Sequence, residues 1–235
     1  MHLSCVAALV SVCALVLPLL HANEPGGAWQ APIARDHPLV GRIWDVTTGA
    51  FIDSAALVNH LSRGKFVLLG EQHDNPDHHR LQTWLLRALI AAGRRPAVGF
   101  EMFTSDDAPA LARHMAAHPT DAVGLAQAVD WQRSGWPEWA MYQPIAEAAL
   151  SAGLPVVATN LSQSTARALG QSGVSALEAA FVARVGLDRP LDADLYTAMA
   201  QEIPSNPPYS TGTSISAGTS RTIASTLPSR PAITL

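Results

Sequence analysis

The sequence predicts an α/β fold in which a mainly parallel sheet is flanked by helices. Three short apolar runs, which begin at residues 66, 97 and 153, read as buried strands, and each is followed by a helical pattern. Strands that alternate with helices favour a parallel sheet. Each run ends in polar residues, and open α/β sheets bind their ligands at the carboxyl ends of their strands. The functional residues are therefore expected at that rim.

The composition excludes one class of function. Charged residues make up 14% of the 235 residues, the net charge is −4 and the pI is near 6.1. This balance gives no electrostatic footprint for a nucleic-acid partner. The length suits one domain with a buried core.

The N-terminal segment predicts export. Residues 3–20 carry no charged side chain, and a polar stretch with Pro and Gly follows. We expect a signal peptide over residues 1–22 and a linker over residues 23–40. A retained membrane anchor is the alternative, since about 18 apolar residues reach the lower limit for a spanning helix. Both cysteines, Cys5 and Cys13, lie in this segment, so the processed chain would have no thiolate ligand.

The first structural elements are predicted from local signals. Residues 41–46 read as a short edge strand. A helix is expected from a cap at Asp53 or Ser54, and Gly64 ends it. Residues 66–69 then read as a buried strand.

An acidic and histidine-rich stretch follows, and a helix is expected after an N-cap at Asn75. Residues two apart in an extended segment point the same way, so Glu71 and His73 would share one face. The helix stripe puts His78 on the inward side, whereas His79 is turned by about 100° and is expected to face solvent. A carboxylate with imidazoles suits a divalent metal or iron. The alternative is a helix-capping network with surface histidines.

The second expected strand, residues 97–102, also carries a carboxylate, Glu101, near its carboxyl end. If this strand and the run 66–69 are parallel neighbours joined by a right-handed crossover, Glu71 and Glu101 meet at one rim. Paired carboxylates near a histidine suit metal ligation or acid/base catalysis, although a lone Glu at a strand end is also a common surface charge. The predicted metal ligands are Glu71, His73, His78 and Glu101.

Aromatic residues gather after residues 106–130, which read as two short helices. Trp131, Trp136 and Tyr142 are candidates for an apolar wall around a flat ligand such as haem. The Tyr142 phenol is a candidate iron ligand. The alternative places these aromatic side chains in the core, as we expect for Trp139.

The third expected strand, residues 153–160, ends in Asn160, whose amide either binds a ligand at the rim or caps the next helix. The helices expected after it span residues 162–170, 174–185 and 192–202. Residues 203–235 are rich in Ser, Thr and Pro and show no periodicity, so we expect a disordered tail. The α/β domain is thus expected over residues 41–202.

Several motifs occur in order along the chain. They are Gly70-Glu-x-His-Asp-Asn-x-x-His-His, Gly99-Phe-Glu-Met, Asp130-Trp, Trp136-Pro, Tyr142-x-Pro and Leu154-Pro-Val-Val-Ala-x-Asn. Over about residues 42–200 this pattern resembles the ChaN-like haem-binding uptake proteins of the Tiki superfamily.

The resemblance implies an α/β fold, export to the periplasm or the outer membrane, and a role in haem or iron uptake. It implies haem or an iron source as the ligand and outer-membrane uptake machinery as the partner, while a homodimer that pairs haem sites is an open alternative. Tyr142 is then a candidate for the haem ligand. Superfamily relatives include metal-dependent peptidases, which implies a divalent metal at Glu71, His73 and Glu101 and makes a hydrolase the alternative function.

Members of that family usually continue with further helices and a strand that ends in a histidine motif, and neither follows residue 203 here. The resemblance therefore implies a sheet that is incomplete at the C-terminus, in a chain truncated or frameshifted near this position. A non-functional fragment of such a domain is the third reading.

Overall fold

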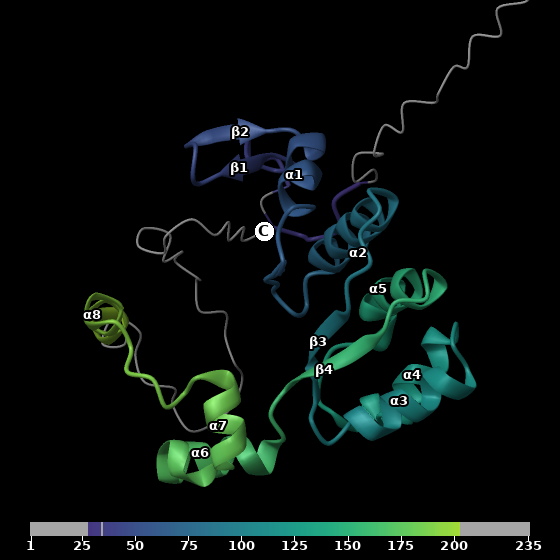
Figure 1. Cartoon of the computed structure of the whole chain (residues 1–235). Helices are drawn as coiled ribbons and strands as arrows, with labels where there is room; N and C mark the ends of the chain where they lie inside the picture. The colour runs from purple at the N-terminus through teal and green to yellow at the C-terminus, as the bar shows by residue number, and fades with distance from the viewer. Residues whose placement is uncertain (1–27, 34, 203–235) are drawn as a thin grey trace, which may run out of the picture.

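The computed structural model describes residues 28–33 and 35–202, and its mixture of helices and strands confirms the α/β class (Figure 1). The expected signal peptide, residues 1–22, and the expected tail, residues 203–235, lie outside the described residues. No helix in the described part of the chain is both long and apolar enough to cross a membrane.

The described chain begins with a hairpin and a capped helix. β1 (Ile43–Asp45) and β2 (Ala50–Ile52) are antiparallel, and α1 (Ser54–Leu61) follows. The Asp53 carboxylate accepts a hydrogen bond of 2.7 Å from the Ala56 N–H, which satisfies one of the free donors at the helix start. The expected edge strand and the expected cap are confirmed.

Helix α2 (Pro76–Ala91) begins where the sequence predicts. The Asn75 side chain accepts a hydrogen bond of 3.0 Å from the Asp77 N–H, and proline occupies the first helical position. The inward face of α2 packs against α1 in a small core. Its buried side chains are Leu57, Val58, Leu61, Leu85 and Leu89.

The start of α2 is also tied to the first described residues. Asp77, which is 2% exposed, accepts hydrogen bonds of 2.8 Å from the N–H groups of Gln30 and Ala31. The Arg80 guanidinium lies 3.1 Å from the other Asp77 oxygen and stands over the Trp29 ring at 4.9 Å. A carboxylate in the first turn suits the positive end of the helix dipole. The N-terminal segment is therefore fastened to α2 by a buried acid.

The prediction of a buried strand at residues 66–69 was wrong. Phe66 and Leu68 are 71% and 78% exposed, while Val67 and Leu69 pack against the small core, so exposure alternates as in an extended chain. No backbone group of this run is hydrogen-bonded to a described residue, so there is no ladder. Apolar alternation buries one side of the run, but a strand also requires a paired neighbour.

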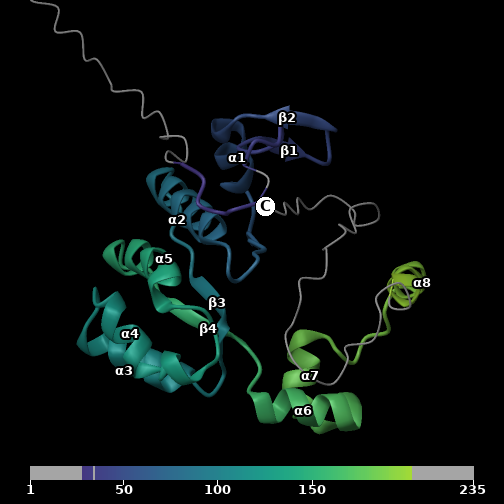
Figure 2. The same cartoon turned by 180° about the vertical axis from the view of Figure 1, so that it is seen from behind.

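The main sheet pairs β3 (Val98–Thr104) with β4 (Val156–Asn160) in parallel, with Phe100 opposite Ala158. In the described chain this sheet has two strands, so β3 has β4 as its neighbour and not the run before α2. The helices around it are α3 (Ala108–Ala117), α4 (Ala122–Ala128) and α5 (Trp139–Ser151). Figure 2 shows α3, α4 and α5 on the same side of the strands, and together they enclose the main core.

The last helices stand apart from this core. α6 (Gln163–Ser172), α7 (Ala179–Val185) and α8 (Ala193–Glu202) confirm the helices expected after the third strand. The Ser162 hydroxyl caps α6 by accepting a hydrogen bond from the Thr165 N–H at 3.1 Å. Neither α6 nor α7 contains a buried residue, and they extend away from the sheet (Figure 1).

Candidate functional site

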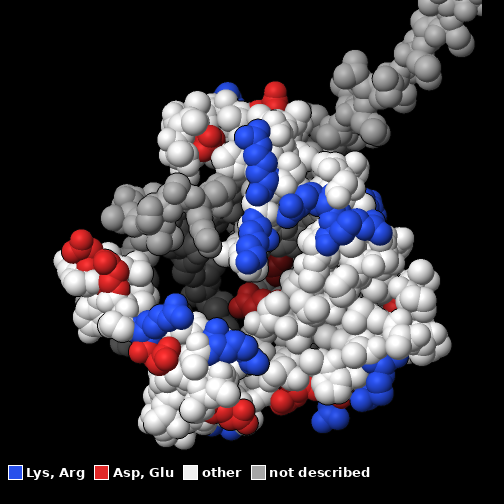
Figure 3. Space-filling model, viewed as in Figure 1, with Lys and Arg blue, Asp and Glu red and all other residues white. Residues whose placement is uncertain are grey.

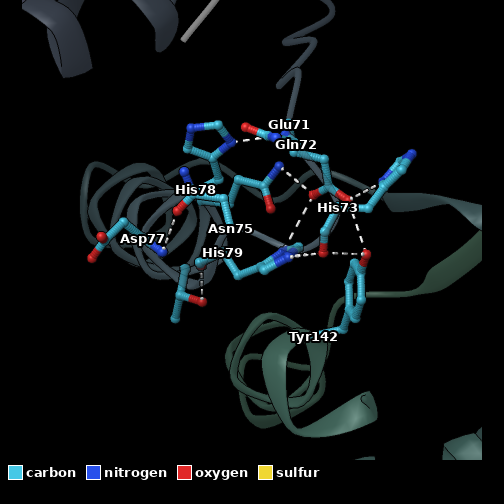
Figure 4. A network of polar contacts seen from close by, with 10 residues as sticks. Glu71, Gln72, His73, Asn75, Asp77, His78, His79 and Tyr142 are labelled. Atoms are coloured by element: carbon cyan, nitrogen blue, oxygen red, sulfur yellow. Dashed lines mark hydrogen bonds and ion pairs between the residues drawn. The ribbon is translucent and has the colours of Figure 1, made fainter. Parts of the chain in front are cut away.

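A carboxylate lies at the centre of a network of polar side chains between α2 and α5 (Figure 4). Glu71 Oε1 accepts hydrogen bonds from His73 Nδ1 at 2.8 Å and from the Tyr142 hydroxyl at 3.1 Å. Its second oxygen accepts from Gln82 Nε2 at 2.9 Å and lies 3.3 Å from His79 Nδ1. Burial raises the pKa of Glu71, but hydrogen bonds from its neighbours outweigh burial and lower it to about 2. Glu71 is therefore an ionised, acceptor-only group.

Helix α2 supplies two of the four side chains around Glu71. His79 and Gln82 are three residues apart, so they lie on the same side of the helix, and they are 2% and 8% exposed. His79 Nε2 also donates to the His73 carbonyl at 3.0 Å. Burial lowers the pKa of His79, while the hydrogen bonds to Glu71 and to that carbonyl raise it, and the net direction is upward.

The expectation that His79 faces solvent was wrong. The inward stripe had been counted back from Leu85 and Leu81, of which Leu85 is buried but Leu81 is only half-buried. The buried positions of α2 also include Gln82, Leu86 and Leu89. Counting back from these positions brings residue 79 inward. The signal in the sequence was a glutamine within the apolar stripe, because a buried amide requires a polar partner.

His73 is the member of this network that reaches the surface. Its side chain is 36% exposed, and its ring lies edge-on to the half-buried Trp136, with centroids 4.8 Å apart. Because Glu71 only accepts hydrogen bonds, His73 Nδ1 carries the proton, and the neutral ring then holds its lone pair on Nε2. No described residue is hydrogen-bonded to that Nε2. A carboxylate behind Nδ1 is the usual support of a histidine that ligates a metal through Nε2.

Tyr142 is fully buried behind this surface. Its ring lies 4.3 Å from the His79 ring and 5.1 Å from the Trp131 ring, and it is 0% exposed. Burial and the charge of Glu71 raise the pKa of the phenol, so it is a neutral donor.

Trp131 is 4% exposed and donates its indole N–H to the Pro137 carbonyl at 2.8 Å. Trp139 is also a core residue, as expected.

The other predicted site residues lie outside this network. His78 Nδ1 accepts a hydrogen bond of 2.8 Å from the Gln72 N–H, and burial lowers the pKa of this imidazole. Glu101 is exposed on β3. The Asn160 oxygen accepts from the Leu161 N–H at 2.8 Å at the end of β4, and Ser162, not Asn160, caps α6.

The structure thus joins Glu71 to His73 and leaves His78 and Glu101 apart from them. Within residues 28–33 and 35–202, no three His, Cys, Asp or Glu side chains are placed to hold a metal ion together. The network instead adds His79, Gln82 and Tyr142 to Glu71. It is a support for one exposed imidazole.

Comparison with known proteins identifies the class. Over residues 57–217 the chain matches haem-binding uptake proteins of the Tiki superfamily. The matching family is ChaN, and the chain belongs to it. The resemblance drawn from the motifs is confirmed, and the match extends past the boundary expected at residue 202. A search of curated proteins found no match.

One solved structure supports the fold. It is ChaN of Campylobacter jejuni, described as binding heme cofacially, with a TM-score of 0.50 and 20% sequence identity. The likeness covers 71% of this chain and 65% of that chain. At this identity it shows a shared fold alone. The present chain spans just under two thirds of that protein.

Proposed function

We propose that this protein is an exported haem-binding protein of haem or iron uptake, and that His73 contacts the haem iron. Membership of the haem-binding uptake family supports the ligand class. The observation that carries the proposal is the geometry of His73, whose Nδ1 is held by Glu71 while Nε2 is open. The uncharged N-terminal segment supports export to the periplasm or the outer membrane.

The residues around His73 fit a porphyrin. Haem binds through one axial ligand and an apolar contact with its face, and a proximal histidine is a common ligand. Trp136 lies against the His73 ring and is half-buried, so it offers an aromatic surface next to the ligating nitrogen. Tyr142 has its phenol engaged with Glu71 and contributes by holding that carboxylate in place.

A haemin titration of the chain without its signal peptide tests this function, with absorbance as the measurement. We expect a saturable shift of the haem band. His73→Ala should abolish or displace that shift, because the axial ligand is removed. His118→Ala is the matched control, since His118 is an exposed histidine at the C-terminal end of α3 whose ring contact is with His114 and not with this network. A wild-type band and affinity in His73→Ala would contradict the assignment.

The metal-dependent hydrolase gains no support from the described residues, because they contain no group of three or more ligands for an ion. A metal analysis of the same purified sample separates the two functions. A stoichiometric divalent metal without any haem shift would favour the hydrolase. The absence of both signals, in a sample that is poorly folded, would favour a non-functional fragment.

A further inference from the structure

Residues 66–70, which we call the edge segment, form an extended stretch on the surface that has no strand partner among the described residues. Phe66 and Leu68 point outward and are among the most exposed large apolar side chains of the described chain. No N–H or C=O group in the edge segment is hydrogen-bonded to a described residue. An exposed apolar strand edge with free backbone groups is a template for another strand, and soluble proteins usually protect such edges.

Four cations lie at the turn where the edge segment begins or next to it in the sequence. Arg63 and Lys65 flank Gly64, and Arg94 donates to the Gly64 carbonyl at 2.7 Å, which brings the end of α2 to this turn. Arg95 is the next residue and is exposed. None of the four forms an ion pair with a described carboxylate. Figure 3 shows Lys and Arg gathered on this face, over α1, α2 and their connection. We call these four residues the basic cluster.

We propose that the edge segment binds an extended strand of a partner polypeptide that carries carboxylates beside its apolar residues. Strand addition would pair the free backbone groups and cover Phe66 and Leu68, and pockets for alternate side chains would set specificity. The carboxylates would face the basic cluster, which steers association and fixes the register. This proposal does not rest on haem binding.

The charges argue against three other occupants. Residues 203–235 contain Arg221 and Arg230 and no acidic side chain, so they do not complement the basic cluster. A second copy paired in parallel through the same segment would bring two basic clusters together, and one paired antiparallel would set each cluster beside Gly70, which carries no charge. A lipid bilayer would complement the cations and the apolar side chains, but it would leave the backbone groups unpaired in a medium without water.

Fluorescence anisotropy of a labelled synthetic peptide tests the proposal on the full chain. The probe is a ten-residue peptide of alternating Val and Thr with two Asp residues at one end. We expect saturable binding, and Lys65→Glu should weaken it at least about tenfold through charge reversal. Arg113→Glu, on the exposed face of α3, is the matched control and should leave affinity unchanged. Phe66→Ser with Leu68→Thr should also weaken binding.

Two control peptides separate strand addition from other binding. A peptide N-methylated at alternate residues keeps its charge but cannot form the ladder, and a peptide with Lys in place of Asp keeps the ladder but not the charge. Equal binding of either control peptide, or no binding of the probe, would overturn the proposal.

Hydrogen exchange and light scattering test the other occupants. In the free chain, the amides of residues 66–70 should exchange rapidly and become protected when the peptide binds. Protection in the free chain would show that the chain itself fills the edge and would overturn the proposal. Dimerisation that is lost in the Phe66→Ser, Leu68→Thr variant would do the same, in favour of a second copy.

Discussion

His79 Nδ1 lies 3.3 Å from Glu71 Oε2, in a pair whose side chains are 2% and 10% exposed. The same imidazole donates to the His73 carbonyl, so one histidine of α2 holds both the carboxylate and the backbone of the preceding turn. His73 is thereby positioned by α2, although it lies outside any helix or strand. The exposed imidazole is supported by a rigid element, which is the arrangement a ligand site requires.

Replacement of Glu71 tests how much the Glu71–His79 pair contributes to the stability of the fold. Glu71→Gln should lower the free energy of unfolding by about 3 kcal/mol, because His79 would be left buried without its charge partner. Urea unfolding followed by circular dichroism measures the change. Asp130→Asn is the control, since Asp130 and Arg133 form an exposed pair at 3.5 Å, and its cost should stay below about 1 kcal/mol. Equal costs for the two variants would contradict the central role of Glu71.

Acid should destabilise the protein through the same carboxylate. The pKa of Glu71 is about 2 in the folded chain against an ordinary value of 4.5. A depressed folded pKa stabilises the fold above the unfolded pKa, and that contribution is lost as the pH falls through the folded value. The free energy of unfolding should therefore decline between pH 4.5 and about 2. In a pH series of urea titrations, Glu71→Gln should show a shallower decline, and an equal slope would count against this assignment.

Tyr142→Phe distinguishes support from ligation. The phenol donates to a charged acceptor, so its loss should cost about 1 to 3 kcal/mol of stability. The haem band should keep its position, because the iron contact assigned here is His73. Absorbance of the haem complex and urea unfolding are the two measurements. A displaced band in Tyr142→Phe, with an unchanged band in His73→Ala, would assign the iron to Tyr142.

Gly99 tests the close approach of β3 and β4. A Cβ at this position would collide with the Thr159 side chain, so Gly99→Ala should destabilise the fold by about 1 to 3 kcal/mol. Thr159→Ser removes the colliding methyl group and should recover most of that loss. Gly170→Ala in α6 is the control, because nothing lies within 4 Å of its Cβ and alanine favours a helix. Thermal unfolding of Gly99→Ala, of Gly99→Ala combined with Thr159→Ser, and of Gly170→Ala checks the pattern. The absence of rescue in the double variant would contradict it.

Local signals in the sequence were sufficient for the helices. Asp53 and Asn75 cap the helices that they were expected to cap, because a cap depends on residues within one turn. The expectation of a mainly parallel sheet is met by the second and third expected strands, which pair in parallel as β3 and β4. The run at residues 66–69 was misjudged because its alternation shows which side is buried but not whether a neighbour exists.

The candidate site was recovered in part for a similar reason. The contact between Glu71 and His73 follows from two residues on one extended segment, and the sequence shows it directly. The roles of His79, Gln82 and Tyr142 depend on how α2 and α5 rotate against each other. That rotation is set by tertiary packing, which a stripe counted from two leucines does not resolve.

The hydrogen bonds from the Gln30 and Ala31 N–H groups to Asp77 limit the length of free chain that precedes α2. If the apolar leader is retained as an anchor, residues 21–28 are the only slack between it and α2, and they reach at most about 28 Å. His73 and its bound ligand would then be held close to the membrane surface. A tether of that length keeps the bound ligand at a high effective concentration for any receptor in the same membrane. Transfer of the ligand to that receptor would then depend on whether the tether can span the distance between them, more than on diffusion through solution.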